Sequence, residues 1–398
     1  MKSVKLRPGR VQPVWAGHPW VYAQAIEQTS DAPESGDEVR VLDAKGNFMG
    51  RGLYTAGSAI PVRLFSRQER DIDAQLFRDK LAAAVQLRKA EGLPAVETNA
   101  YRVVHGEGDG LPGLIVDRFG DTLSVQLGTV GLWRRRDTVL SVLDEQLQPK
   151  HIYDRTTKKA ASMERFALEA TEHDYPLVKG TPAPLRFNEL GLQFEVPFEL
   201  QQKTGYYADQ RPLREFVAAR SEGKRVLDAY SYVGAIGINA ARGGASRVLS
   251  IDRSSAAIAV ANACAQVNGV SETYEAVTGD IFDLCREQEA ESFDIAVFDP
   301  PKLAPRKQNR EVAMKLLRRL SKEAARVTQT GGLVVLSSCS SALGPKELAR
   351  ALALGALDNG KQMQVVARVF QGPDHPVPAA FPEGEYLSTL VCRVTERS

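Results

Sequence analysis

The chain has 398 residues, of which 43% are hydrophobic and 25% charged, and its formal net charge is only +2. This composition excludes a disordered chain, and the length predicts two or three domains rather than one core. No apolar run approaches the roughly 20 residues that a membrane span needs, which argues against a membrane protein.

The opening stretch and the cysteines indicate the compartment. MKSVKLRPGR lacks the apolar core of a signal peptide, so nothing in it directs export. The cysteines Cys264, Cys285, Cys339 and Cys392 form no CxxC pair, which argues against a metal site and against a disulfide framework. We therefore expect a cytoplasmic protein that holds no metal.

Residues 1–72 predict a small β-rich domain. Short alternating stretches such as EVRVLD (38–43) and AIPVRLF (59–65) are separated by turns rich in glycine and aspartate, which is typical of a small barrel.

Residues 73–184 predict a compact α+β domain. An apolar helical period runs through its first part and ends at Gly92. Two strands flank a hairpin turn at Gly120, and a further helix is expected around 131–146. The stretch KGTPAPLRF (179–187) has the composition of a linker.

Local basic stretches stand out on this nearly neutral chain. They lie at residues 1–10, 133–136 and 302–319. Such patches suit selective contact with a polyanion, and ordinary solvated faces are the alternative for each patch taken alone.

Residues 185–398 predict an α/β domain, because strands alternate with helices from there on. The expected strands are RVLDAY (225–230), RVLSID (247–252), YEAVTGD (274–280), FDIAVFD (293–299) and GGLVVLSS (331–338). Repeated strand–helix units form a mainly parallel sheet with helices on both faces. Ligands of such sheets bind beyond the carboxyl ends of the strands.

Three of these strands end in a carboxylate. Asp228 ends the first, and Gly234 and Gly237 follow in the turn into a helix, where glycine lets the backbone approach a ligand. Asp252 ends the second strand and can bind both hydroxyls of a ribose. Asp280 ends the third, where an adenine amino group can be bound.

The ordered set of carboxylates predicts a nucleoside cofactor without phosphates. The chain has no GxxxxGK[ST] phosphate loop, and Asp228 would repel a pyrophosphate. A cationic nucleoside fits better, and S-adenosylmethionine is such a cofactor. The alternative for each aspartate taken alone is a helix cap, and the series of three is what favours the cofactor.

The fourth strand runs into FDPPK, residues 298–302. Two prolines stiffen the backbone after Asp299, because each fixes φ and lacks an N–H. A similar Asp/Asn-Pro-Pro followed by an aromatic residue occurs in methyltransferases that act on amino groups of bases. Here Lys302 follows, which weakens the case for reaction at an exocyclic amine.

The fifth strand ends at Cys339 within SSCSS. A thiolate that adds to carbon-6 of a pyrimidine activates carbon-5 as a nucleophile, so a cysteine beside a methyl donor suits covalent catalysis. Asp299 would bind the cytosine edge and share a proton. The alternative for Cys339 is a small core residue. The core interpretation is the better one for Cys264, Cys285 and Cys392, which lie inside predicted helices and a strand.

The chain resembles bacterial large-subunit ribosomal RNA cytosine-5 methyltransferases that have an N-terminal PUA domain. The resemblance runs almost end to end and rests on these stretches: HPWVY, HGEGDGLPGLIVDRFGD, KTGYYADQR, FDPPK, SSCS and DHPVPAAFPEGEYL. It implies an α/β fold with a PUA barrel, a central α+β domain and a Rossmann-like class I S-adenosylmethionine-dependent methyltransferase domain.

The resemblance also implies roles for particular residues. Catalysis falls to Cys339 as the nucleophile and to Asp299. The implied cofactor-binding residues are Asp228, Tyr230, Ser231, Gly234, Asp252, Arg253, Asp280, Ile281, Gln202 and Asp209. The implied substrate-binding residues are Pro300, Pro301, Lys302, Lys203, Arg7 and Arg10. Trp20 and Arg51 are further candidates for RNA contact, with a core position as the alternative for Trp20.

The expected function is formation of 5-methylcytosine in 23S ribosomal RNA or a large-subunit precursor. Two alternatives stay open: methylation of an exocyclic amine on guanine or adenine, and a non-catalytic RNA-binding assembly factor. His375 is either a base on the substrate side or a residue that stabilises a turn. The sequence does not determine the oligomeric state, but an edge strand near the C-terminus could pair two copies in a homodimer.

Overall fold

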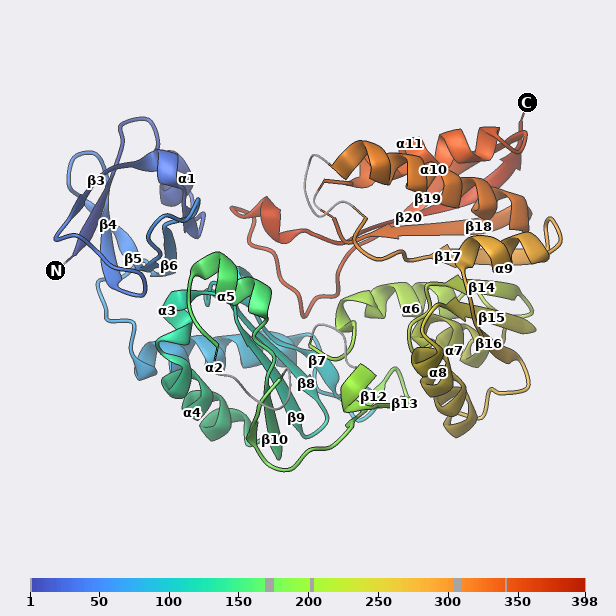
Figure 1. Ribbon diagram of the computed structural model, residues 1–398, viewed down its shortest axis with the longest axis horizontal. Helices are drawn as coiled ribbons and strands as arrows, with labels where there is room; N and C mark the ends of the chain where they lie inside the picture. The colour runs from blue at the N-terminus through green and yellow to red at the C-terminus, as the bar shows by residue number, and fades with distance from the viewer. Residues whose placement is uncertain (1, 169–174, 201–203, 304–308, 341, 398) are drawn as a thin grey trace. The chain divides into compact units, whose positions relative to one another are not determined.

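The computed structural model describes residues 2–168, 175–200, 204–303, 309–340 and 342–397 (Figure 1). The chain divides into two compact units. Unit 1 comprises Met1–Asn188, Gln201–Ala208 and Pro373–Gly384, and unit 2 comprises Glu189–Leu200, Asp209–Gly372 and Glu385–Ser398. Among the helices of the described ranges, none is long and apolar enough to cross a membrane.

The N-terminal part of unit 1 is a six-stranded sheet with the order β2-β6-β5-β4-β1-β3. β1 pairs in parallel with β4, and the other strand pairs of this sheet are antiparallel. Its elements are β1 (Ser3–Leu6), α1 (Gln12–Trp15), β2 (Trp20–Val21), β3 (Ile26–Ser30), β4 (Glu38–Leu42), β5 (Phe48–Tyr54) and β6 (Val62–Ser66). The alternating stretches EVRVLD and AIPVRLF therefore contain strands, as predicted, and they bury a core that includes Val39, Val41 and Val62.

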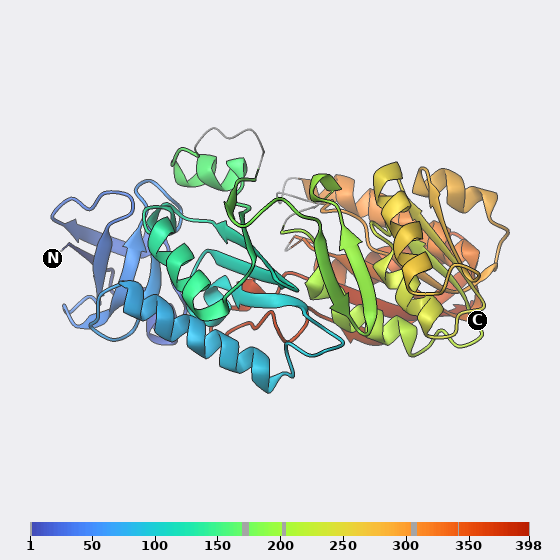
Figure 2. The same ribbon diagram turned by 90° about the horizontal axis from the view of Figure 1, so that it is seen from below.

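The second sheet of unit 1 has the order β11-β10-β9-β8-β7. Its elements are α2 (Ala74–Ala90), β7 (Ala100–His105), β8 (Leu114–Phe119), β9 (Thr122–Leu127), α3 (Val130–Trp133), α4 (Arg136–Leu147), β10 (His151–Asp154), α5 (Lys158–Glu164) and β11 (Leu177–Lys179). Helices α2 and α4 pack side by side (Figures 1 and 2). The Asp73 side chain caps α2 by accepting the Leu76 N–H at 2.9 Å.

Two local predictions in this region need correction. The helix expected around 131–146 is two helices, because the backbone at Arg135 leaves the helical region with φ −110° and ψ 16°. The expected linker 179–187 runs into strand β12 (Leu185–Glu189), in which Leu185 and Phe187 are buried. The hairpin of β8 and β9 is as predicted, with Gly120 at φ 57°.

Unit 2 is built on a seven-stranded sheet with the order β16-β15-β14-β17-β18-β20-β19. The first five strands are parallel, and β20 runs antiparallel between β18 and β19. The strands of this sheet are β14 (Arg225–Ala229), β15 (Arg247–Asp252), β16 (Tyr274–Thr278), β17 (Phe293–Phe298), β18 (Thr328–Ser338), β19 (Lys361–Val369) and β20 (Ser388–Glu396). Unit 2 also contains β13 (Leu192–Val196), which is not part of this sheet. The predicted parallel arrangement is confirmed.

Helices cover both faces of this sheet, as predicted. They are α6 (Arg211–Ala218), α7 (Ala235–Arg242), α8 (Ser255–Val267), α9 (Ile281–Glu287), α10 (Arg310–Val327) and α11 (Pro345–Leu357). Helices α6, α7 and α8 lie on one face and α9, α10 and α11 on the other (Figure 1). Strand β13 lies along α8 (Figure 2).

The parallel strands end at one edge of the sheet. In the register of the sheet, Asp228 on β14 lies between Ser250 on β15 and Val297 on β17. Asp299 comes one residue after the end of β17, and Cys339 one residue after the end of β18. The topology therefore brings the predicted chemical residues to neighbouring strand ends.

Candidate active site

Asp228 is a buried carboxyl at the centre of this edge, with 1% of its surface exposed. Its Oδ2 accepts the Gly237 N–H at 2.9 Å and the Ser250 hydroxyl at 3.4 Å. Its Oδ1 has no hydrogen-bond partner in the part of the chain that the structure describes. Burial raises the pKa of Asp228 to about 7, and the negative charges of Asp299 and Asp252 add to the increase.

The loop after β14 is held in an unfavourable backbone conformation. Tyr230 and Tyr232 have φ values of 65° and 52°, in the left-handed region that non-glycine residues seldom adopt. The hydrogen bonds that hold it include one from the Ser231 N–H to the Ile251 carbonyl at 3.0 Å and one from the Tyr232 N–H to Asp252 Oδ2 at 2.9 Å. Strain of this kind concentrates at ligand sites, because the surrounding structure must maintain it.

The two glycines after this loop have a packing role of their own. A Cβ at Gly234 would lie 2.1 Å from the Tyr274 hydroxyl, and one at Gly237 would lie 2.4 Å from Ser250 Oγ. Gly234 also has φ 74°. The sequence interpretation explained both by approach to a ligand, whereas the structure shows that they let α7 pack onto β15 and β16. The cofactor contact of Gly234 stays a prediction.

Asp252 uses both carboxylate oxygens to hold local backbone. Oδ2 accepts the Tyr232 N–H and Oδ1 accepts the Ser254 N–H, each at 2.9 Å. Each oxygen keeps a second lone pair, so the predicted binding of ribose hydroxyls is compatible with this geometry.

Asp280 caps a helix, which is the alternative considered for it. Its Oδ1 accepts the N–H groups of Phe282 at 2.9 Å and Asp283 at 3.3 Å at the start of α9. Arg253 pairs with Oδ2 and lowers the pKa of Asp280. Ile281, expected beside the adenine ring, is only 1% exposed and packs in the core of the sheet.

Asp299 has a partner that the sequence interpretation missed. The Gln210 side-chain Nε2 donates to Asp299 Oδ2 at 2.9 Å. Gln210 is buried, and its Oε1 has no hydrogen-bond partner among the described residues. It follows Asp209 in the quoted stretch KTGYYADQR, but no spacing rule distinguishes it from its neighbours.

Asp209 connects two segments of unit 2. Its Oδ2 accepts the Tyr386 hydroxyl at 2.6 Å, and its carbonyl accepts the Gly372 N–H at 3.2 Å. The predicted site residues Gln202 and Lys203 lie outside the described residues.

The FDPPK turn presents its last two residues to solvent. Pro300 is buried, whereas Pro301 and Lys302 are exposed. Exposure beyond Asp299 suits the predicted role of Pro301 and Lys302 in binding a large substrate, which stays a prediction.

Cys339 differs from the other cysteines in its burial. Its side chain is half-buried, whereas Cys264, Cys285 and Cys392 are buried, which confirms their predicted core position. Burial raises the pKa of Cys264, and it raises the pKa values of Cys285 and Cys392 to about 12 and about 11. These three thiols stay protonated and unreactive near neutral pH.

The serines around Cys339 build its turn. Ser337 shares a hydrogen bond of 2.8 Å with the Thr389 hydroxyl on β20. The Ser338 hydroxyl accepts the Ser340 N–H at 3.2 Å. These bonds fix the backbone on both sides of the thiol.

The candidates for RNA contact in unit 1 fall into two groups. Arg7 and Arg10 are exposed, and Arg7 Nε donates to the Ile26 carbonyl at 2.9 Å. The expectation for Arg51 is wrong, because it is buried and pairs with Glu38 and Asp71.

Two further candidates in unit 1 are engaged with protein groups. Trp20 is half-buried, and its Nε1 donates to Glu107 at 2.8 Å. His375 is buried with its Nδ1 3.1 Å from Asp374 Oδ1, which favours the interpretation as a turn-stabilising residue.

Among the described residues, no three His, Cys, Asp or Glu side chains are grouped to hold a metal ion.

Comparison with known proteins defines the family. A model of the PUA-like domain matches residues 4–67, and a model of the S-adenosylmethionine-dependent methyltransferase matches residues 138–382. The chain belongs to this methyltransferase family. Ribosomal RNA large subunit methyltransferase I of Shewanella amazonensis is 34% identical over 98% of this chain and 99% of its own. The protein of the same name from Erwinia tasmaniensis is 32% identical over 98% of each chain.

Solved structures of methyltransferases share the fold. A SAM-dependent methyltransferase from Streptococcus mutans superposes with a TM-score of 0.80 at 17% identity, covering 99% of this chain and 100% of its own. The structure of SMU.776 complexed with SAH gives 0.83 at 18% identity with the same coverage. This methyltransferase therefore has the class I fold with an N-terminal PUA-like domain.

The cofactor of this methyltransferase is S-adenosylmethionine, and the residues at the strand ends fit it. Asp228 Oδ1 and Ser231 Oγ are buried polar atoms without partners among the described residues, which marks an incomplete polar site. The carboxylates of Asp228 and Asp252 suit a cation with a ribose. No phosphate group has to be accommodated beside Asp228.

Proposed function

We propose that this methyltransferase forms 5-methylcytosine in 23S ribosomal RNA, free or in a large-subunit precursor, through a covalent adduct to Cys339. Two relatives that match 98% of the chain are named ribosomal RNA large subunit methyltransferase I, which supports the RNA class. The observation that carries the proposal is the position of Cys339, half-buried at the end of β18 and next to the strand that leads to Asp299. The relatives come from bacteria, which make ribosomal RNA in the cytoplasm, so the cytoplasm would be the place of action.

The proposed chemistry uses the thiolate of Cys339. Its sulfur forms a bond to carbon-6 of the cytosine, and the electron pair of the carbon-5–carbon-6 double bond moves to carbon-5. The bound cofactor supplies an electrophilic methyl group on its sulfonium. After carbon-5 is methylated it loses its proton to a base, the double bond forms again, and Cys339 leaves as thiolate.

In this proposal Asp299 holds the cytosine edge. Its carboxyl can bond the exocyclic amino group and the ring nitrogen, so that a proton is shared as charge builds on the ring. Gln210 fixes one oxygen of this carboxyl at 2.9 Å and acts as a positioning residue. The base must leave its stack to reach both groups, which costs a few kcal/mol.

The test uses 23S ribosomal RNA that lacks the modification. Incubation with the protein and labelled S-adenosylmethionine, followed by mass spectrometry of the nucleosides, should give labelled 5-methylcytosine. Cys339→Ala should lower this transfer at least a thousandfold and leave cofactor binding intact, because the thiol is the nucleophile. Cys264→Ala, which changes a buried thiol, serves as the matched control.

Two outcomes would overturn parts of the proposal. A label on an exocyclic nitrogen of guanine or adenine would replace the product. Full transfer by Cys339→Ala would exclude the covalent adduct.

A further inference from the structure

Three of the sequence stretches that carry the family resemblance meet inside unit 1. Trp20, in HPWVY, donates from Nε1 to Glu107 at 2.8 Å, in HGEGDG. The same indole packs edge-on against Phe381, with ring centroids 4.6 Å apart. His18 Nε2 lies 3.4 Å from a Glu383 carboxylate oxygen. None of the roles proposed above explains why these stretches come together.

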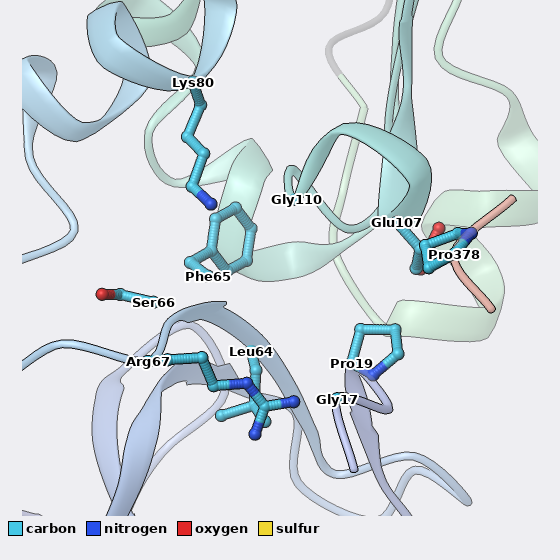
Figure 3. Close-up of a pocket in the computed structure, with 10 residues that line it drawn as sticks. All are labelled: Gly17, Pro19, Leu64, Phe65, Ser66, Arg67, Lys80, Glu107, Gly110 and Pro378. Atoms are coloured by element: carbon cyan, nitrogen blue, oxygen red, sulfur yellow. The ribbon is translucent and has the colours of Figure 1, made fainter. Parts of the chain in front are cut away.

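A pocket of about 120 Å³ lies beside this junction (Figure 3). Its lining includes Phe65, Arg67, Lys80, Glu107 and Gly110. All of these residues belong to unit 1. The volume accommodates a phosphate group and a few waters but is small for a nucleobase with its ribose.

Lys80 brings an uncompensated positive charge to the pocket. Its side chain comes down from α2, and the ammonium lies above the Phe65 ring in Figure 3. A Cβ at Gly110 would be 2.7 Å from Lys80 Nζ, so the ammonium lies close to the backbone of Gly110. No carboxylate of the described residues pairs with Lys80, and burial together with the charges of Arg70 and Arg67 lowers its pKa.

Arg67 adds a second cation on the opposite wall. Its guanidinium donates to the Val14 carbonyl at 2.6 Å and to the His18 carbonyl at 2.9 Å, so its hydrogen bonds go to neutral backbone groups. Glu107 is the acidic residue of the lining, and its Oε1 is already bonded to Trp20. Two cations and one engaged carboxylate leave the pocket with a net positive charge.

We propose that this pocket binds a phosphate group, with Lys80 as its main contact and Arg67 as the supporting charge. The source would be a backbone phosphate of the RNA, which rests on the function proposed above. Burial strengthens this contact relative to one on an open surface, because the charges are less screened by water. Phosphate contacts position an RNA without reading its sequence, so the site would fix the register of the substrate.

The test compares Lys80→Gln with Lys89→Gln. Lys89 lies on the same helix, is exposed and does not line the pocket. Binding of large-subunit RNA, measured by fluorescence anisotropy over a series of salt concentrations, should weaken about tenfold in Lys80→Gln. The slope of log K against log salt should become shallower by about 0.7–0.9, the value for one lost phosphate contact. Lys89→Gln should stay within twofold of the unchanged protein.

A second arm identifies the source of the phosphate and controls for folding. Line broadening of inorganic phosphate in ³¹P NMR reports occupancy by a free anion, and Lys80→Arg, which keeps the charge, should restore most of the RNA affinity. Loss of phosphate broadening in Lys80→Gln with unchanged RNA affinity would overturn RNA as the source. Unchanged affinity, salt slope and broadening in Lys80→Gln would overturn the site itself. These readouts measure binding alone, so they are independent of which base is methylated.

Discussion

At the scale of single residues, the site depends on the different burial and hydrogen-bond partners that the fold gives to chemically identical groups. Asp228, Asp252, Asp280 and Asp299 are four carboxyl groups at neighbouring strand ends with four different sets of partners. Asp280 is paired with Arg253, so it keeps its charge. Asp228 is buried beside other carboxylates, so its charge is disfavoured until a cationic ligand binds.

This difference predicts a pH dependence of cofactor binding. The carboxyl of Asp228 has its pKa raised to about 7, so it is mostly neutral at pH 6 and mostly ionised at pH 8. A cationic ligand is attracted by the ionised form, and its affinity should therefore rise about tenfold from pH 6 to pH 8. Calorimetric titration with S-adenosylmethionine measures this change.

Asp228→Asn is the control, because in this variant the pH dependence of the affinity no longer includes the ionisation of Asp228 and still includes that of the ligand itself. An identical pH profile in Asp228→Asn would show that Asp228 does not set the dependence.

At the scale of elements, α7 and its two glycines determine how closely a helix can approach the sheet. Ser250 and Tyr274 project from β15 and β16 into the space that a Cβ at Gly237 would take. The Gly237 N–H is also the donor that holds Asp228 Oδ2. Packing of α7 and the position of the central carboxyl are therefore coupled.

Gly237→Ala should lower the free energy of unfolding by about 1–3 kcal/mol, because the added methyl group overpacks a tight contact. Urea denaturation followed by circular dichroism measures this loss. Ser250→Ala in the same chain should recover part of it, because the nearest atom to the new methyl is Ser250 Oγ at 2.4 Å. An equal cost with and without the Ser250 hydroxyl would contradict this explanation.

At the scale of the whole molecule, the chain does not follow its units in order. Pro373–Gly384 belongs to unit 1, although it lies between β19 and β20 of unit 2. Its Asp374 side chain accepts the Arg102 N–H at 2.9 Å, and its carbonyl accepts from the buried Arg88 at 2.8 Å. The domain boundaries expected at residues 72 and 184, and the homodimer through an edge strand, stay predictions; β19 is the strand at that edge.

Cofactor binding should stabilise the two units unequally. A ligand at one hundred times its dissociation constant stabilises the state that binds it by about 2.7 kcal/mol. Hydrogen exchange followed by mass spectrometry should therefore show strong protection in β14, β15 and the loop between β14 and α7. The six-stranded sheet of unit 1 should show little change. Equal protection in both sheets would contradict the assignment of the cofactor to the strand ends.

Much of this protein is determined by local sequence. The strand–helix alternation after residue 185, the helix α2 and the hairpin of β8 and β9 follow from apolar period and turn residues, which act over a few positions. The same locality allowed Asp228, Asp252, Asp299 and Cys339 to be identified, because each lies at a strand end that the pattern shows.

Only the tertiary structure decided which groups meet. Gln210 on Asp299, Tyr386 on Asp209 and the ion pairs of Arg51 join residues 13 to 177 positions apart, and no local pattern encodes such contacts. The glycines of α7 were assigned to a ligand because their packing partners lie on other strands. The tertiary structure also distinguishes the four cysteines, whose thiols have the same intrinsic chemistry. Three of them are buried in the core, whereas Cys339 lies half-buried where β18 ends.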